Sequence, residues 1–303
     1  MNLLKSSVSI FIVLFLSVTI FSQKRATKVV AKPNTIVFAV LDDGKTIEPI
    51  GEIVKGELTA TANGEDDSKV LNEFTNSYYK PKTAYSLIFG GAANGTVTVK
   101  SFDVKADCAK NLAQVATESA KAKLKGFVMG LATNMMIDKT SSPFRRLPTA
   151  TERAEIESLV RAEFAKQKVS ANAVKKLNYY NLTALDVDNN DKAEMVGSYW
   201  VQSSVKERNE LFFIAEKDKS DKYKFGYQEY NKITPEDFMS GDMKDLDFLG
   251  GELLLDALDY NGDKIAEIFT VNKAFEGNNF QVYSRQNGKW TKVFEGYNYH
   301  CAY

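Results

Sequence analysis

Histidine is almost absent from this sequence, and its scarcity excludes several kinds of catalytic site. His300 is the only histidine among 303 residues. A zinc site of the HExxH type needs two histidines, and a Ser-His-Asp or Cys-His site would have to use His300. The sequence has no GxSxG turn for a nucleophilic serine. Cys301 is adjacent to His300, but neighbours in a strand point to opposite faces, so a thiol–imidazole pair is not expected.

A net charge is also missing. The chain has 39 lysine and arginine residues against 39 aspartate and glutamate residues, and the two signs are mixed along its length. A protein that binds nucleic acid or an anionic membrane surface usually has a basic face. Nucleic acid is therefore not expected as a partner.

Cysteine is scarce, with only Cys108 and Cys301. In an oxidising compartment the two could form a disulfide that joins the middle of the chain to its end. The alternative is two separate, partly buried thiols. The sequence alone does not decide between them.

Long apolar runs are missing except at the N-terminus, where residues 8–21 follow the positively charged Lys5. This run is shorter than the roughly 20 residues that a membrane helix needs, and a polar stretch follows it. The pattern predicts a signal peptide over residues 1–22, cleaved after Ser22, and a periplasmic or secreted protein with no stable membrane anchor after cleavage. A retained N-terminal anchor is the alternative. No cysteine lies near the cleavage point, so a lipoprotein anchor is excluded.

Residues 23–34 are predicted to be a linker and residues 35–145 a small α+β domain. The apolar run TIVFAVL is followed by Asp43-Gly44, which favours a hairpin turn. Residues 65–79 have apolar side chains at helical spacing, and residues 107–125 are expected to form a second helix with Asp107 as its N-cap. The glycine-rich GGAANG leads into an alternating strand rather than a helix, so it is not a phosphate loop.

Two prolines at residues 143–148 mark a change of composition. Thr149 lies three residues before Glu152, the spacing of a helix capping box. The rest of residues 146–303 contains many strand-like runs, and they predict a β-rich domain of two antiparallel, blade-like sheets at about 181–231 and 252–300. The predicted fold class is thus α+β, with helices that link the two domains.

Two segments of this second domain are nearly the same. Residues 182–194 read LTALDVDNNDKAE and residues 255–267 read LDALDYNGDKIAE, with six identical positions at an offset of 73. Both copies have oxygen-bearing side chains at positions 1, 3, 5 and 9 of an acidic loop. These residues are Asp186, Asp188, Asn190 and Glu194 in the first loop, and Asp259, Asn261, Asp263 and Glu267 in the second.

This spacing predicts calcium binding. Calcium takes six to eight oxygen ligands, and a loop that coils around the ion presents alternate side chains inward, with a backbone carbonyl near position 7. Lys192 and Ile265 occupy position 7 and would offer those carbonyls. The alternative is that the Asp, Asn and Gly residues form turns and cap their own backbone.

The two segments resemble the strand, acidic loop, strand motif of the FG-GAP or VCBS repeats found in integrin-type β-propellers. An EF-hand is excluded because position 12 is Gly197 or Thr270 instead of glutamate, and the flanking segments read as strands. The resemblance implies a β-propeller-like blade around each loop, with calcium bound in the loop. Asp191 and Lys264 depart from the motif because they stand where the family usually has glycine.

These features together predict an exported, non-catalytic binding or structural protein with calcium-stabilised loops. Its partner would be an extracellular or periplasmic protein or glycan. The alternative is a secreted, carboxylate-based hydrolase with an accessory N-terminal domain. A cleft lined by convergent carboxylates outside the two loops would favour the hydrolase.

Overall fold

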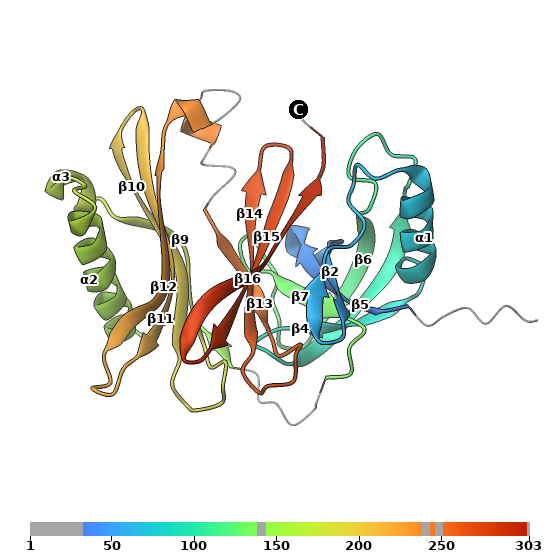
Figure 1. Ribbon diagram of the computed structural model, residues 1–303, viewed down its shortest axis with the longest axis horizontal. Coiled ribbons are helices and arrows are strands. Elements are labelled where there is room, and N and C mark those ends of the chain that lie inside the picture. The colour runs from blue at the N-terminus through green and yellow to red at the C-terminus, as the bar shows by residue number, and fades with distance from the viewer. Residues whose placement is uncertain (1–32, 138–143, 238–242, 246–250, 302–303) are drawn as a thin grey trace, which may run out of the picture. The chain divides into compact units, whose positions relative to one another are not determined.

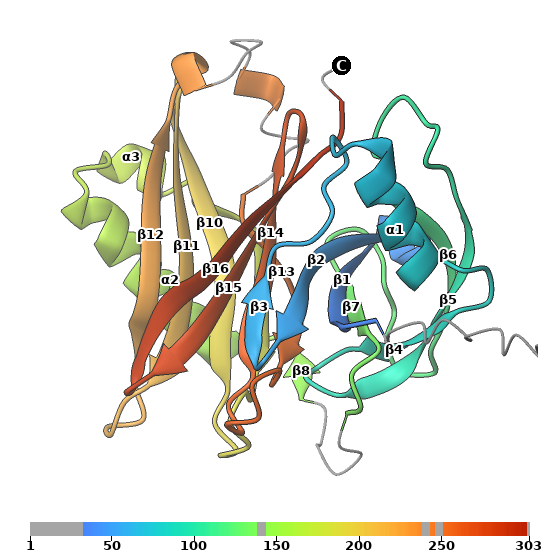
Figure 2. The ribbon, with the colours of Figure 1, turned by 45° about the vertical axis from the view of Figure 1, so that its right-hand side comes forward.

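A computed structural model describes residues 33–137, 144–237, 243–245 and 251–301. Within these residues, sixteen strands form three sheets and three α-helices pack against them (Figures 1 and 2). The predicted signal peptide at residues 1–22 and most of the predicted linker at 23–34 lie outside this part of the chain. No helix of the described residues is long and apolar enough to cross a membrane.

The first sheet closes on itself. Six antiparallel strands are hydrogen-bonded in the order β1–β7–β4–β5–β6–β2, and β2 pairs back with β1 to complete a barrel. β3 (Glu57–Thr59) extends β2 outside this ring. The ring consists of β1 (Thr35–Leu41), β2 (Thr46–Val54), β4 (Ala84–Ile88), β5 (Ala93–Phe102), β6 (Ala113–Glu118) and β7 (Gly130–Thr133).

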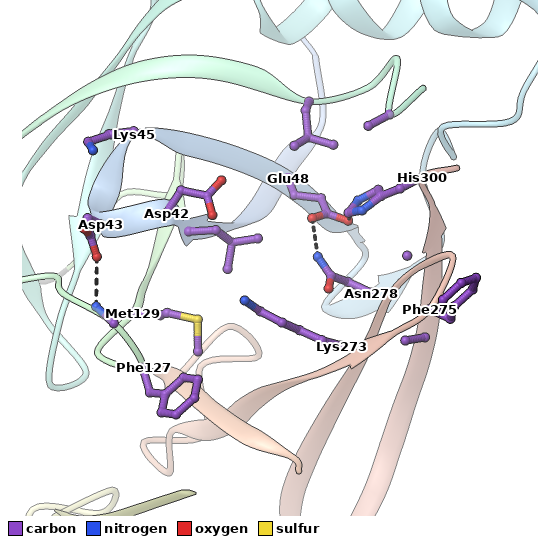
Figure 3. A pocket seen from close by; sticks show the side chains of 16 residues that line it. Asp42, Asp43, Lys45, Glu48, Phe127, Met129, Lys273, Phe275, Asn278 and His300 are labelled. Carbon is purple, nitrogen blue, oxygen red and sulfur yellow. Dashed lines mark hydrogen bonds and ion pairs between the residues drawn. The ribbon is translucent and has the colours of Figure 1, made fainter. Parts of the chain in front are cut away.

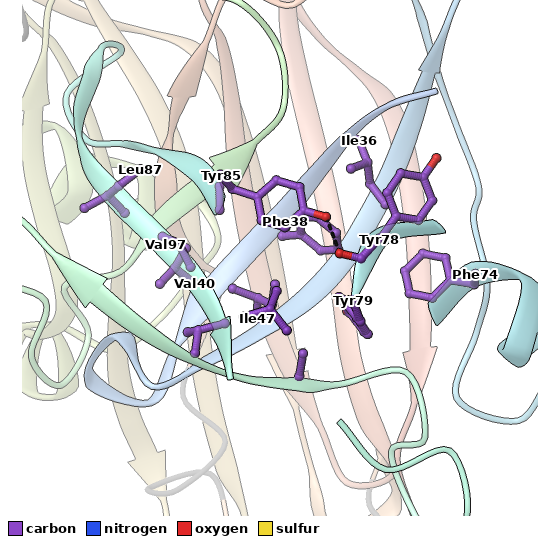
Figure 4. Packing of buried hydrophobic residues seen from close by; sticks show 14 residues of the cluster. Ile36, Phe38, Val40, Ile47, Phe74, Tyr78, Tyr79, Tyr85, Leu87 and Val97 are labelled. Carbon is purple, nitrogen blue, oxygen red and sulfur yellow. Dashed lines mark hydrogen bonds between the residues drawn. The ribbon is translucent and has the colours of Figure 1, made fainter. Parts of the chain in front are cut away.

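Both faces of β1 are buried, which explains its uninterrupted apolar sequence. Successive side chains of a strand point to opposite faces. Ile36 and Phe38 point into the barrel, where side chains fill the interior (Figure 4). Val37 and Ala39 point outward and pack against the third sheet. A strand with two buried faces has no position left for a polar residue.

α1 (Ser68–Tyr78) confirms the helix predicted at residues 65–79. The side chain of Asp67 accepts hydrogen bonds from the first free backbone N–H groups and so caps the helix. Phe74 and Tyr78 then pack into the same cluster as the barrel interior. The apolar stripe of this helix therefore serves the core.

The second sheet has the order β12–β11–β10–β9–β8 and carries two helices on one face. α2 (Ala150–Lys166) begins with the predicted capping box of Thr149 and Glu152, and it buries Ile156, Val160 and Phe164 against the sheet. α3 (Ala171–Val174) follows it. The strands are β8 (Arg145–Arg146), β9 (Asn178–Leu185), β10 (Glu194–Ser204), β11 (Glu207–Lys217) and β12 (Tyr223–Ile233).

The third sheet lies between the second sheet and the barrel. Leu254 and Ile268 pack against the second sheet, whereas Leu253 and Phe269 pack against the outside of the barrel. Its order is β13–β14–β15–β16. The strands are β13 (Leu253–Leu258), β14 (Glu267–Ala274), β15 (Gly277–Gln286) and β16 (Lys289–Tyr299).

A buried ion pair connects these layers. Asp256 on β13 is fully buried, and its carboxylate accepts a hydrogen bond of 2.6 Å from Arg145 of β8. The same carboxylate accepts the backbone N–H groups of Gly90 and Gly91, at 3.0 and 2.9 Å. The glycine-rich turn between β4 and β5 thus holds an anion, but the anion is a side chain of the chain itself.

The predicted α+β class is wrong, because strands dominate the described residues and the N-terminal part is a closed barrel. The segment expected to be a helix at 107–125 contains β6. Its helix-favouring alanines and lysines are overridden by pairing with β5 and β2, which buries Ala113 and Val115 on one face. Tertiary contacts thus determine the secondary structure of this segment, although its local sequence preference is helical.

The two cysteines form a disulfide between Cys108 and Cys301. Cys108 lies in the connection between β5 and β6, and Cys301 follows β16. The bond therefore ties the C-terminal strand of the third sheet to the barrel. Of the two alternatives that the sequence left open, the disulfide is the one that the structure contains.

Candidate functional site

The first acidic loop connects β9 to β10 and brings three carboxylates together. Oxygen atoms of Asp186, Asp188 and Glu194 lie within 4.8 Å of one another, so this cluster could hold a metal ion. Asp186 also accepts the backbone N–H groups of Asn190 and Asp191, at 3.1 and 2.9 Å. The loop therefore folds around the carboxylate at its first position.

A charged neighbour from the third sheet faces this cluster. Arg285 of β15 forms an ion pair with Oδ2 of Asp188 and lies 3.8 Å from Glu194. Oδ1 of Asp188 is buried and has no hydrogen-bond partner. Glu194 is 3% exposed, and burial raises its pKa to about 7. A cation bound here would favour the ionised form of Glu194.

The remaining predicted ligands of the first loop take part in its own turns. Asn190 uses its side-chain oxygen to accept the backbone N–H of Lys192 at 2.8 Å. Glu194 accepts the backbone N–H of Val187 at 3.2 Å. Both the calcium hypothesis and its alternative, self-capping turns, thus have support in the same loop.

The second loop connects β13 to β14 and closes through its own hydrogen bonds. Asn261 donates its amide N–H to Glu267 at 2.7 Å, and Ser284 donates its hydroxyl to the same oxygen at 3.2 Å. Asp263 accepts the backbone N–H of Ile265, and Asp259 accepts that of Lys264. Of the described carboxylates, only those of the first loop gather closely enough for three to share one ion.

The two loops nevertheless share one backbone conformation. Positions 4 and 6 have positive φ in both: 55° at Asn189 and 63° at Asp191, then 83° at Gly262 and 71° at Lys264. Asp191 and Lys264 thus adopt the left-handed conformation that glycine adopts most easily. The sequence repeat is therefore a repeat of backbone shape.

The sheets around the loops repeat as well. The pairing of β11 with β12 shifts register between Ile214 and Ala215, and the pairing of β15 with β16 shifts between Val282 and Tyr283. Ala215 pairs with Met195 of β10, and Tyr283 pairs with Ile268 of β14. Met195 and Ile268 are 73 residues apart, so the two bulges lie at equivalent places in two similar units of four strands.

A large cavity, of about 870 Å³, opens between the barrel and the third sheet (Figure 3). Asp42, Asp43 and Lys45 line it from the turn between β1 and β2, and the hairpin of β14 and β15 supplies Lys273 and Phe275. Further lining residues are Leu41, Glu48, Leu112, Phe127, Met129, Asn278 and His300. The cavity thus combines an apolar wall with several charged groups.

Glu48 and His300 form a buried polar cluster at one side of the cavity. Glu48 is fully buried, and its carboxylate accepts amide N–H groups of Asn278 at 2.7 Å and Asn298 at 2.6 Å. His300 Nε2 lies 3.0 Å from the same carboxylate. Burial lowers the pKa of His300, but the hydrogen bond and charge of Glu48 outweigh it, so that pKa is raised.

The other carboxylates of the cavity also have donors, whereas its lysine side chains lack acceptors within the described part of the chain. Asp42 accepts the hydroxyl of Thr46 at 2.7 Å, and Asp43 accepts the backbone N–H of Gly126 at 2.8 Å. Lys273 is half-buried and reaches toward the middle of the labelled side chains in Figure 3. The side-chain ammonium groups of Lys45 and Lys273 make no hydrogen bond or ion pair with any described residue.

Sequence reasoning missed this cavity. Glu48 and Asn278 are 230 residues apart, and Glu48 and His300 are 252 apart. No local motif connects them. The available signal was the single histidine next to a cysteine, because a disulfide at Cys301 places His300 beside the barrel.

Comparison of the chain with protein-family models, curated proteins and solved structures found no match. The likeness of the two loops to FG-GAP or VCBS repeats stays a prediction.

Proposed function

We propose that this protein is a non-catalytic binding protein, and that the cavity between the barrel and the third sheet takes a small organic anion with an apolar body. The observation that carries the proposal is the side chain of the half-buried Lys273, whose ammonium group has no acceptor among the described residues. Ligand sites are typically concave and mostly apolar, with a few polar groups that fix orientation. This cavity has that composition.

The hydrogen-bond partners of the charged side chains in the cavity indicate that the ligand is negatively charged. Asp42, Asp43 and Glu48 each accept a hydrogen bond from the protein, so their negative charge is partly compensated. The ammonium groups of Lys273 and of the exposed Lys45 have no acceptor among the described residues. A carboxylate or phosphate group would supply acceptors, and charge-assisted hydrogen bonds of this kind are the strong ones.

The rest of the ligand would lie on the apolar wall. Leu41, Phe127, Met129 and Phe275 line the cavity, and Phe127 is 41% exposed. Apolar area removed from water contributes roughly 25 cal/mol per Å². A short acyl or aromatic group would therefore add affinity without further polar contacts.

The test is calorimetric titration with octanoate, with octyl phosphate and, as a neutral control, with 1-octanol. We expect an anion to bind and Lys273→Met to weaken it by about tenfold or more, because a hydrogen bond to a charged group contributes roughly 1.5–3 kcal/mol. Lys289→Met, at an exposed lysine where β16 begins, should leave the affinity unchanged. Failure of both anions to bind, or equal affinity of Lys273→Met, would overturn the proposal.

A second candidate function is calcium binding in the first loop. Its support is the close cluster of Asp186, Asp188 and Glu194, together with the buried Asp188 oxygen that lacks a partner. Asn190 and the backbone carbonyl of Lys192 would complete an oxygen shell of the kind that calcium prefers. The ion would be structural, because a ligand that binds only the folded state raises its stability.

Thermal unfolding with calcium and with a chelator tests this candidate. We expect calcium to raise the midpoint for the wild type and for Asp263→Asn in the second loop. We expect no rise for Asp188→Asn, which lacks the charged ligand. An identical response of the wild type and Asp188→Asn would argue against the site.

We further propose that the protein is exported and acts in the periplasm or outside the cell. The Cys108–Cys301 disulfide supports this proposal, because such bonds form and persist in oxidising compartments. The predicted protein or glycan partner and the alternative of a carboxylate-based hydrolase both stay predictions.

A further inference from the structure

A second, smaller cavity lies between the second and third sheets, which face each other in both ribbon views (Figures 1 and 2). Its volume is about 250 Å³, and its lining is almost entirely polar. The charged residues that line it are Glu210, Glu229, Glu252, Glu295 and Lys292. Four carboxylates thus face one ammonium group.

Glu252, directly before β13, is the most deeply buried of these acids, with 9% exposure. Its Oε1 accepts the hydroxyls of Thr270 at 2.6 Å and Tyr283 at 2.7 Å. Its Oε2 accepts no hydrogen bond from the described residues. This oxygen is not one of the buried side-chain atoms that lack a partner, so it is open to the cavity and can accept an N–H from a ligand.

Two of the other acids already have cationic neighbours. Glu229 lies 3.4 Å from Lys292 and accepts the hydroxyl of Tyr227 at 2.8 Å. Glu210 accepts the hydroxyl of Tyr180, which in turn accepts an N–H of Arg208. Glu252 and Glu295 form no ion pair with a described residue, and Lys292 acts on Glu252 only through its charge, without direct contact. The cavity thus has room for about two positive charges.

A single metal ion does not fit this spacing. Calcium binds oxygens at about 2.3–2.6 Å, so its ligands lie within roughly 5 Å of one another. No three carboxylates of this cavity meet that limit, whereas those of the first loop do. The ligand must therefore span the cavity, whose volume corresponds to roughly eight waters at about 30 Å³ each.

Side-chain amides supply further partners for such a ligand. Asn231, Asn272 and Asn279 line the cavity, and their side chains make no hydrogen bond with the described residues. Each amide oxygen can accept an N–H. Phe212 adds an aromatic surface, which also attracts cations.

We propose that this cavity binds a small organic cation with two amine or guanidinium groups. Each cationic group would donate N–H bonds to a carboxylate, and Glu252 would take one of them through its Oε2. The site is separate from the cavity that contains Lys273, since the two cavities share no lining residue. Its ligand is also of opposite charge.

The test is calorimetric titration of the full chain with 1,4-diaminobutane, with 1,4-butanediol as the neutral control of the same shape. We expect the diamine to bind and the diol to produce no binding heat. Glu252→Gln should weaken diamine binding at least tenfold, because it leaves a cation facing a neutral group. Glu229→Gln should weaken it too, and Glu73→Gln, at an exposed position of α1, should have no effect.

Thermal unfolding of each variant shows whether it is folded, so that a loss of binding can be distinguished from a loss of folding. Absence of binding heat for the diamine in the wild type would overturn the proposal, as would equal affinity in Glu252→Gln and Glu229→Gln. Equal binding of the diol would show a site for neutral polyols instead. Octanoate should not displace the diamine, and competition between them would also contradict the assignment.

Discussion

At the scale of single residues, buried acids are the most unusual feature of this protein. Glu194, Glu252 and Glu267 each have a pKa raised to about 7, and burial is the largest cause for all three. Glu194 and Glu267 occupy the same position of the repeated loops. A carboxyl group in such a place holds its proton until near neutral pH.

These shifts predict how stability depends on pH. Because the folded pKa of Glu252 lies above its ordinary value of 4.5, the folded state binds more protons than the unfolded state between about pH 4.5 and 7. The contribution of Glu252 to the free energy of unfolding is therefore fully present below about pH 4.5. It falls as the pH rises to about 7 and is constant above that pH. Glu194 and Glu267 contribute in the same direction.

Glu252→Gln should remove the contribution of Glu252, because glutamine is neutral at every pH and can still accept the two hydroxyls. We expect the variant to unfold at about the same urea concentration as the wild type at pH 4.5. At pH 8 it should be more stable than the wild type by on the order of 3 kcal/mol, because the pKa of Glu252 is about 7 in the folded state and 4.5 in the unfolded state. Glu73→Gln is the control, and parallel pH curves for Glu252→Gln and the wild type would contradict this explanation.

At the scale of elements, the sequence predicts those helix ends and turns that depend on a few neighbouring residues. The capping box of Thr149 and Glu152 marks the start of α2, and the turn of Asn287-Gly288 connects β15 to β16. The strands around the repeated loops are also where their alternating patterns predict them. Caps and turns use side chains within one turn of the backbone, so distant contacts seldom change them.

Elements whose form depends on distant partners are the ones that the sequence misses. The segment 107–125 has the alanines and lysines of a helix, but the barrel needs a strand, β6, within it to connect β5 to β2. Closure of the barrel also pairs Val37 with Thr133, across 96 positions of the chain. No periodicity within one segment can indicate such a pairing.

The candidate sites divide in the same way. Asp186, Asp188 and Glu194 lie within one short loop, so their spacing predicts the cluster that the structure contains. Lys273 and Glu252, in contrast, line cavities whose other walls come from residues on other sheets. Their surroundings are visible only after the three layers have packed.

At the scale of the whole molecule, the contact between layers depends on a few polar connections within large apolar surfaces. Arg145 donates to Asp256 and to the backbone carbonyls of Met129 and Leu255, at 2.9 and 2.8 Å. It thereby connects β8 of the second sheet with the barrel and the third sheet. A buried charge requires such complete hydrogen bonding, because its loss of hydration is large.

We therefore expect Asp256→Ala to destabilise the protein strongly. The change leaves the Arg145 guanidinium buried without its counterion and removes the acceptor of the Gly90 and Gly91 N–H groups. Breaking a buried pair from one side costs about 3–5 kcal/mol. Urea unfolding would measure this loss.

The control is Asp221→Asn, since asparagine tolerates the positive φ of 61° at this position. The side chain of Asp221 is 67% exposed and pairs with Lys217 at 3.0 Å. An exposed pair contributes about 0–1 kcal/mol, because water solvates both charges well. If the two variants lost similar stability, the buried pair would not be what connects the layers. Replacing Arg145 and Asp256 together with apolar residues should recover part of the loss, because it removes both buried charges at once.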